Sequence, residues 1–171
     1  MNWEAIGVVA EVVGAVGVII TLVYLAFQIR QNTNQLQGDA ISAINEGHVT
    51  LLRDFRDDME LVTAYVKCGN DWESGSAQEQ LRAHAHLLAY VSNFETAYNL
   101  WRSGALAERI YKNREDIIVA VISPPGTKTW WTMWSSFFDP EFAALITKRI
   151  HAPDARNIFD DVPFLHPKHW K

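Results

Sequence analysis

The pattern of apolar and polar residues divides the chain at about residue 30. From Ala5 to Phe27 almost every residue is apolar, whereas a helix on the surface of a soluble bundle keeps one polar face. At about 1.5 Å per residue these roughly 23 residues form a helix of about 35 Å, and a hydrocarbon core is about 30 Å thick. The pattern therefore predicts a transmembrane anchor within residues 1–30.

Two other interpretations of this segment fit less well. A buried helix of a soluble bundle would have to explain why the segment is apolar on every face. A signal peptide would begin with basic residues and end at a small-residue cleavage site. This chain instead begins MNWE, carries Glu11 inside the apolar run and continues with QIRQNTNQLQ. We expect an uncleaved anchor.

Beyond residue 30 the apolar residues recur every three or four positions, which predicts helices with short breaks. The anchor is expected to continue as a stalk to about Arg56. Shorter helices are predicted over residues 59–66, 76–104, 105–121, 127–136 and 140–150. No alternating pattern predicts a strand. We therefore expect an all-α protein, with one N-terminal transmembrane helix that continues into a stalk and a small helical-bundle domain after it.

Helix start signals support this division. Ser76 followed by Glu79 forms a predicted capping box, and Asp139 before Pro140 suits the start of another helix. The predicted buried residues of the 76–104 helix are Leu81, Ala85, Leu88, Val91, Phe94, Tyr98 and Trp101. Those of the following helix are Ile110, Ile117 and Val121.

The stalk and the bundle form the predicted domain over residues 31–152, and residues 153–171 form a tail rich in proline and aromatic residues. Its prolines should prevent a regular helix and keep the segment extended. Three arrangements stay open for the tail, which could wrap its own domain, dock on a partner or be disordered.

Small and polar residues share one face of the predicted anchor, because spacings of three and four place them together on a helix. They are Gly7, Ala10, Glu11, Gly14, Gly17 and Thr21. The step from Ala10 to Gly14 lets another helix backbone approach closely. A carboxylate inside the membrane costs on the order of 3 kcal/mol. Glu11 is therefore expected to reach headgroup water, to lie in an oligomer seam, or to line an ion or proton path.

The basic residues favour one orientation of the anchor. No Lys or Arg precedes the apolar segment, whereas Arg30 follows it at once, and basic flanks stay on the cytoplasmic side. The single cysteine, Cys68, cannot form an intramolecular disulfide and agrees with this side. We expect a single-pass protein of the inner (cytoplasmic) membrane whose C-terminal domain is cytoplasmic.

Composition and motifs disfavour several classes of function. The 171 residues include 15 basic and 20 acidic ones, a net charge of -5, which gives no electrostatic footprint for nucleic acid. The HExxH, CxxC, P-loop, GxGxxG and GxSxG motifs are absent from the sequence. His84 and His86 lie on opposite sides of their helix and cannot share a metal. We predict no catalytic residue, cofactor or metal site, and we favour a protein that is not an enzyme.

Two further features of the bundle could carry interactions. Glu95 lies near the predicted buried stripe and should need a basic partner, with Arg102 as the preferred candidate and Arg109 as another. The aromatic residues around Trp130 are expected to close the core near the SPPG turn. If Trp130, Trp134 and Phe138 were exposed instead, they would form a partner surface.

Three segments in order resemble a large, functionally uncharacterised family of small bacterial membrane proteins. The first is an anchor that ends in YLAFQIRQNT, residues 24–33. The second is FETAYNLWRSGAL, residues 94–106, and the third is GTKTWWTMWSSFFDPEFAALI, residues 126–146. The resemblance covers most of the chain and matches the tail beyond Ala152 less well. It implies a single-span anchor with a helical domain, and it carries no established activity and no catalytic residues.

The favoured function is a membrane-anchored helical scaffold or an accessory subunit of a membrane complex, with the lipid bilayer and a homo-oligomer or larger complex as partners. A first alternative is an oligomeric pore or proton-conducting element that uses Glu11 and Thr21. A second is a membrane-tethered enzyme or ligand sensor with a pocket near Glu95 and the tryptophans.

Overall fold

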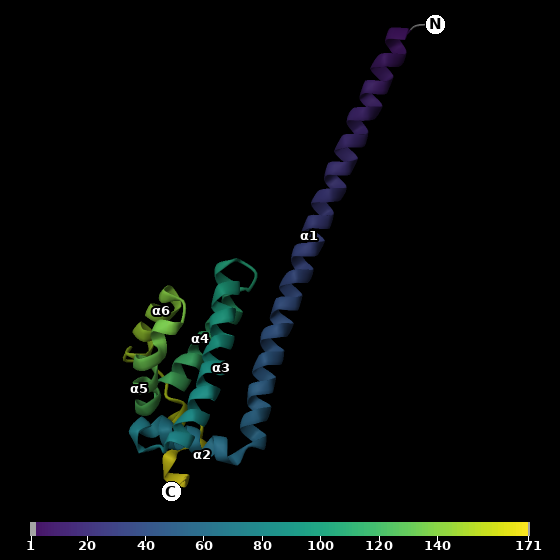
Figure 1. Ribbon diagram of the computed structural model, residues 1–171. Helices are drawn as coiled ribbons and strands as arrows, with labels where there is room; N and C mark the ends of the chain where they lie inside the picture. Colours follow the sequence, from purple (N-terminus) through teal and green to yellow (C-terminus); the bar gives the residue numbers. More distant parts are fainter. Residues whose placement is uncertain (1–2, 171) are drawn as a thin grey trace. The chain divides into compact units, whose positions relative to one another are not determined.

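The computed structural model describes residues 3–170. The chain is 86% helical, and no strand occurs in the described part, so the predicted all-α fold is confirmed (Figure 1). It divides into two compact units, Met1–Asp39 and Ala40–Lys171. The long helix α1, Trp3–Asp57, contributes residues to both units.

The first unit consists of the N-terminal part of α1. Its apolar side chains from Val13 to Ile29 are exposed, with Ile20 62% and Phe27 70% exposed. The helix is long and apolar enough to cross a membrane, and none of its most apolar stretch is buried by protein. An exposed apolar surface of this kind is unfavourable in water. The predicted membrane-spanning helix therefore has a counterpart in the structure.

The second unit is a helical bundle that includes the C-terminal part of α1. Its main helices are α2 (Met59–Asn70), α3 (Ala77–Arg102), α4 (Glu108–Ile122), α5 (Pro125–Trp134) and α6 (Pro140–Ile150). Short elements complete it, namely α7 (Ile158–Asp161), η1 (Trp72–Ser74), η2 (Ser135–Phe137), η3 (Pro163–Leu165) and η4 (Pro167–His169). Part of the predicted stalk thus belongs to the bundle, because Ile44 is only 3% exposed and Phe55 packs against the core.

Side-chain caps fix the starts of three helices. Asp58 accepts a hydrogen bond from the Leu61 amide at 2.9 Å and starts α2. Ser76 and Glu79 form the predicted capping box of α3, and Asp139 accepts from the amides at the start of α6. Each cap satisfies amides that otherwise have no partner in the first turn. The predicted starts at Ser76 and Asp139 are confirmed.

The core is closed by tryptophans from α5. Trp130 and Trp131 are 0% and 2% exposed. The indole nitrogen of Trp130 donates to Nδ1 of His84 at 3.0 Å, and that of Trp131 donates to Oγ1 of Thr147 at 2.9 Å. Buried indoles need such partners. The prediction that these rings close the core is confirmed.

The predicted buried face of α3 is partly wrong. Leu81 is 66% exposed, whereas Ala83, Leu87 and Tyr90 are buried. The reason is that α3 contacts both α2 and α4, so its buried face is wider than one stripe and is turned relative to the predicted one in its first half. In α4 the inward prediction is confirmed for Val121 and wrong for Ile117, which is 42% exposed.

The helix α4 begins three residues later than predicted, because residues 103–107 form a turn. Gly104 adopts a φ of 77°, a conformation that glycine reaches without steric cost. The amides of Ala105 and Leu106 then both donate to the carbonyl of Leu100, at 2.8 and 3.0 Å. These residues close the end of α3, so the next helix begins only at Glu108.

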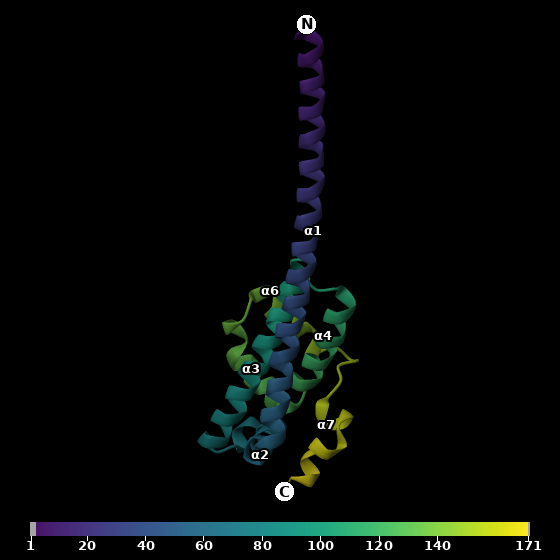
Figure 2. The same cartoon turned by 90° about the vertical axis from the view of Figure 1, so that its right-hand side faces the viewer.

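The tail wraps its own domain and is not a plain extended segment (Figure 2). It forms the single turn α7 and the short helices η3 and η4. Phe159 and Leu165 are 4% and 7% exposed and belong to the core. The prolines at 163 and 167 each occupy the first turn of a short helix, where a missing amide costs nothing. The prediction of an extended chain is therefore wrong for these stretches.

Candidate functional site

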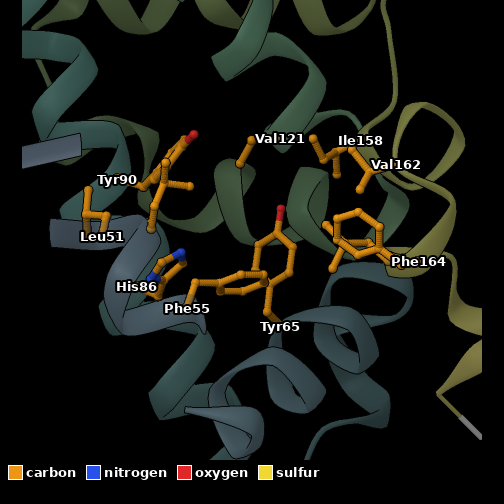
Figure 3. Close-up of a pocket in the computed structure, with 11 residues that line it drawn as sticks. Leu51, Phe55, Tyr65, His86, Tyr90, Val121, Ile158, Val162 and Phe164 are labelled. Carbon is orange, nitrogen blue, oxygen red and sulfur yellow. The ribbon is translucent and has the colours of Figure 1, made fainter. Parts of the chain in front are cut away.

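An apolar cavity of about 240 Å³ lies inside the second unit (Figure 3). The end of α1, the helices α2, α3 and α4, and the tail all contribute to its wall. The lining residues are Leu51, Leu52, Phe55, Tyr65, His86, Tyr90, Val121, Ile158, Val162, Phe164 and Leu165. Its lining consists almost wholly of aliphatic side chains and rings, and it contains no acidic residue, lysine or arginine. Apolar concave sites with a few polar groups are typical of ligand pockets, so we take this cavity as the candidate site.

Aromatic rings from successive helices form one side of the cavity. Phe55 stacks on His86 with ring centroids 5.2 Å apart, and it meets Tyr65 edge to face at 5.3 Å. The ring centroids of His86 and Tyr90 are 5.9 Å apart. On its other side Tyr65 contacts Phe159 of the tail at 6.1 Å. Rings at these separations hold one another in place, so this wall is preorganised.

Three polar groups line the cavity without a hydrogen bond from the protein. Tyr65 and Tyr90 are 4% and 8% exposed, and within residues 3–170 neither hydroxyl nor the His86 ring is hydrogen-bonded. Figure 3 shows the Tyr65 hydroxyl directed toward the side where Val121 and Ile158 lie. Neither hydroxyl oxygen is fully enclosed by protein atoms. These groups are therefore available to a bound molecule.

The cavity is electrically neutral near pH 7. Burial raises the pKa of the Tyr65 hydroxyl, and it raises that of Tyr90 to about 12. Burial also lowers the pKa of His86, an effect that the nearby Asp54 opposes. None of the lining side chains is an acid, a lysine or an arginine. The arrangement can hold an apolar molecule and hydrogen-bond to it, and it offers no activated nucleophile.

Sequence reasoning did not find this cavity. It treated His86 only as a possible metal ligand and Phe55 only as part of the stalk. The recurrence of ring-bearing residues at His86, Tyr90 and Phe94, four apart, could have indicated an aromatic face on α3. No sequence signal indicated that the tail would supply a wall, because that contact joins residues far apart in the chain.

The anchor residues predicted to form a seam lie in the first unit. Gly7 and Glu11 are exposed, while the side chain of Ala10 lies outside the described residues. A Cβ atom added at Gly14 or Gly17 would meet no atom within 4 Å. Thr21 donates its hydroxyl to the Gly17 carbonyl at 2.9 Å. The face is thus open, and the Thr21 proton is held within its own helix.

Glu95 and Arg102 have partners other than each other. The Glu95 carboxylate accepts a hydrogen bond from the backbone amide of Asp139. Arg102 pairs with Glu141 at 2.6 Å. The predicted Glu95 and Arg102 pair is therefore corrected, because the start of α6 supplies a partner to each of them.

The predicted aromatic partner surface is also corrected. Trp130 is fully buried and Phe138 is 6% exposed, so neither is free to meet a partner. Trp134 is half-buried and packs on His84 at 4.4 Å. These rings lie in the core or pack against it, as the favoured interpretation predicted, and they do not form the alternative partner surface.

The most buried charge in the domain is Glu115 of α4, which is 3% exposed. It pairs with Lys112 at 2.9 Å and with Nε of Arg149 at 3.1 Å. Arg149 also pairs with Asp116 at 3.0 Å. A buried carboxylate needs compensation of this kind. The cluster ties α4 to α6, and we interpret it as structural.

Comparison of the chain with family models, curated proteins and solved structures gave no match.

Proposed function

We propose that this protein is a membrane-anchored helical module that acts without chemistry of its own, as a scaffold or accessory subunit of a membrane complex. The observation that carries the proposal is the contrast between the two units. The first exposes apolar side chains over the whole stretch from Val13 to Ile29, while the second buries most of its aromatic residues in a core of its own. Lipid is the solvent that suits the first unit, and water suits the second.

We further propose that the domain lies on the cytoplasmic side of the inner membrane. Arg30 directly follows the apolar stretch, and basic residues near the end of a span favour the cytoplasmic side. The resemblance to a family of bacterial single-span proteins supports the anchor and says nothing of the side on which the domain lies.

Cysteine labelling in sealed, right-side-out membrane vesicles tests the orientation. Cys68 is fully buried, and burial raises its pKa to about 11, so the native background is low. The variant Glu73→Cys places a thiol at an exposed position of the domain. A membrane-impermeant maleimide should label it only after the vesicles are opened, whereas Asn2→Cys should be labelled in closed vesicles. The reverse pattern would contradict the cytoplasmic assignment.

We propose that the partner contacts the small-residue face of the anchor. Small residues let helix backbones approach closely in lipid, and the space beside Gly14 and Gly17 is open. A carboxylate within a span is costly in lipid and is stabilised by a partner or by headgroup water. Glu11 is therefore expected to lie at or near this contact.

Purification of the complex in mild detergent, followed by mass spectrometry, tests this contact. Gly14→Ile places a branched side chain on the small-residue face. Val16→Ile places the same isoleucine side chain about 200° around the helix and serves as the control for a large apolar residue away from this face. The first variant should lose its co-purifying chains and the second should keep them. Equal recovery with both variants would contradict a contact through this face.

A further inference from the structure

The cavity in the bundle contains hydrogen-bonding groups that the protein itself does not use. Tyr65 and Tyr90 are both more than nine-tenths buried, and their hydroxyls line an otherwise apolar space without a partner from the described residues. Neither hydroxyl oxygen is fully buried, although both rings are. Each hydroxyl can therefore donate a hydrogen bond to a molecule that lies beside it in the cavity.

We propose that this cavity binds a neutral apolar molecule that carries a carbonyl or hydroxyl oxygen. The hydrocarbon part lies against Phe55, Leu51 and Val121, and the oxygen accepts a hydrogen bond from the hydroxyl of Tyr65 or Tyr90. This binding site goes beyond the scaffold role, which needs no ligand.

The volume of the cavity limits how much of the bound molecule can be buried in it. A cavity of about 150 Å³ holds benzene, and this one measures about 240 Å³. It therefore accommodates a ring with several further carbon atoms, or a chain of similar volume. The stacked wall of Phe55 and His86 offers an aromatic face against which a ring can lie.

The lining residues also favour an uncharged ligand. A carboxylate would need a basic partner in the cavity, because an unpaired buried charge is strongly unfavourable. No lysine or arginine lines the cavity, and burial lowers the pKa of His86, so the imidazole is neutral near pH 7. A neutral molecule matches these groups, whereas a fatty-acid anion does not.

The tail forms the wall through which a ligand can enter the cavity. Ile158, Val162, Phe164 and Leu165 form one wall, and this wall consists of single-turn elements. Phe164 lines the cavity and is still 71% exposed, so it lies at the mouth. Movement of the tail opens the cavity without separating the long helices.

Photocrosslinking of the full chain in lipid nanodiscs tests the proposal. The probe is benzophenone, a neutral aromatic ketone that reacts with nearby C–H bonds on illumination, and peptide mass spectrometry locates the label. Labelling of the peptides that contain Phe55, Tyr65 or Tyr90 is expected, and excess nonanone should suppress it. Labelling of residues 13–29 reports probe dissolved in lipid and serves as the internal reference.

Variants separate the cavity from non-specific partitioning. Val162→Trp fills the cavity and should lower labelling of the cavity peptides at least about tenfold, since several buried carbon atoms of the probe lose their place. Val49→Trp makes the same change at an exposed position and should leave labelling unchanged. If Val162→Trp does not fold by circular dichroism, Leu51→Trp fills the cavity from the opposite wall. Unchanged labelling in a folded, filled variant would overturn the proposal.

Two comparisons test the chemistry of the molecule. The combined change Tyr65→Phe and Tyr90→Phe keeps the rings and removes the hydroxyls, and it should weaken labelling about two- to tenfold, as expected for one net hydrogen bond. The para-carboxylate analogue of benzophenone should label the cavity at least about tenfold less than benzophenone itself. No effect of the double change, or equal labelling by the carboxylate, would overturn the assignment of a neutral oxygen-bearing molecule.

Discussion

Gly126, in the first turn of α5, is the position where a single methyl group should disturb the bundle most. A Cβ atom added there would overlap the carbonyl oxygen of Cys68. It would also lie 2.8 Å from the backbone nitrogen of Trp72 and 2.9 Å from the carbonyl oxygen of Gly69. All of these are backbone atoms, which cannot rotate away as a side chain could. The variant Gly126→Ala must therefore move α5 away from α2 and η1.

The size of the effect follows from what α5 carries. Overpacking a well-packed interior costs about 1–3 kcal/mol, and a shift of α5 also loosens the fully buried Trp130 and Trp131. The gain in helix propensity from glycine to alanine returns at most about 1 kcal/mol. We expect a net loss of about 3 kcal/mol in the free energy of unfolding of the domain, which lowers Tm by about 6–12 °C.

Thermal unfolding of the full chain in detergent micelles, followed by near-ultraviolet circular dichroism of the tryptophans, measures this loss. Gly104→Ala is the matched control, because a Cβ atom there meets no atom within 4 Å and only the φ of 77° opposes it. It should cost about 1 kcal/mol. If Gly126→Ala lowers Tm no more than Gly104→Ala does, the close approach of α5 to α2 is refuted.

Three further changes test the packing and electrostatics of the bundle. Arg149→Met leaves the buried Glu115 short of a partner and should cost about 3 kcal/mol in urea unfolding, with a smaller loss for Arg149→Lys. Because burial lowers the pKa of His86, the unfolded state binds more protons, so the free energy of unfolding should fall as pH drops from about 7 to 5. His86→Phe should reduce this slope, and an identical slope would contradict burial of a neutral imidazole. Ser76→Ala removes the α3 cap and should cost about 1 kcal/mol; an unchanged Tm would contradict its role.

Local signals in the sequence predicted the starts of helices best. The capping box at Ser76 and the Asp139 cap before Pro140 each depend on residues within one helical turn. Such local interactions can be recognised from a few consecutive residues. The end of α3 was less visible. The amides of Ala105 and Leu106 could have continued into a helix, and only the φ of Gly104 redirects them.

Contacts between distant segments were less predictable. Arg102, about two helical turns from Glu95, was the predicted partner of its carboxylate. The carboxylate instead accepts a hydrogen bond from the amide of Asp139, which is 44 positions further along the chain. The cavity has the same origin, because its wall joins Leu51 to the tail around Val162. Periodicity tells which face of a helix is apolar, and it does not tell which element covers that face.

The measurement that tests the central claim most directly is alkaline carbonate extraction of membranes from cells that express the full chain. Wild-type protein should stay in the pellet and leave it only with detergent. Lysines at Ile19 and Ile20 add about 5–7 kcal/mol to the cost of insertion and should move the chain to the supernatant, whereas leucines there should not. Wild-type protein that carbonate releases as a soluble monomer would contradict a lipid-embedded anchor.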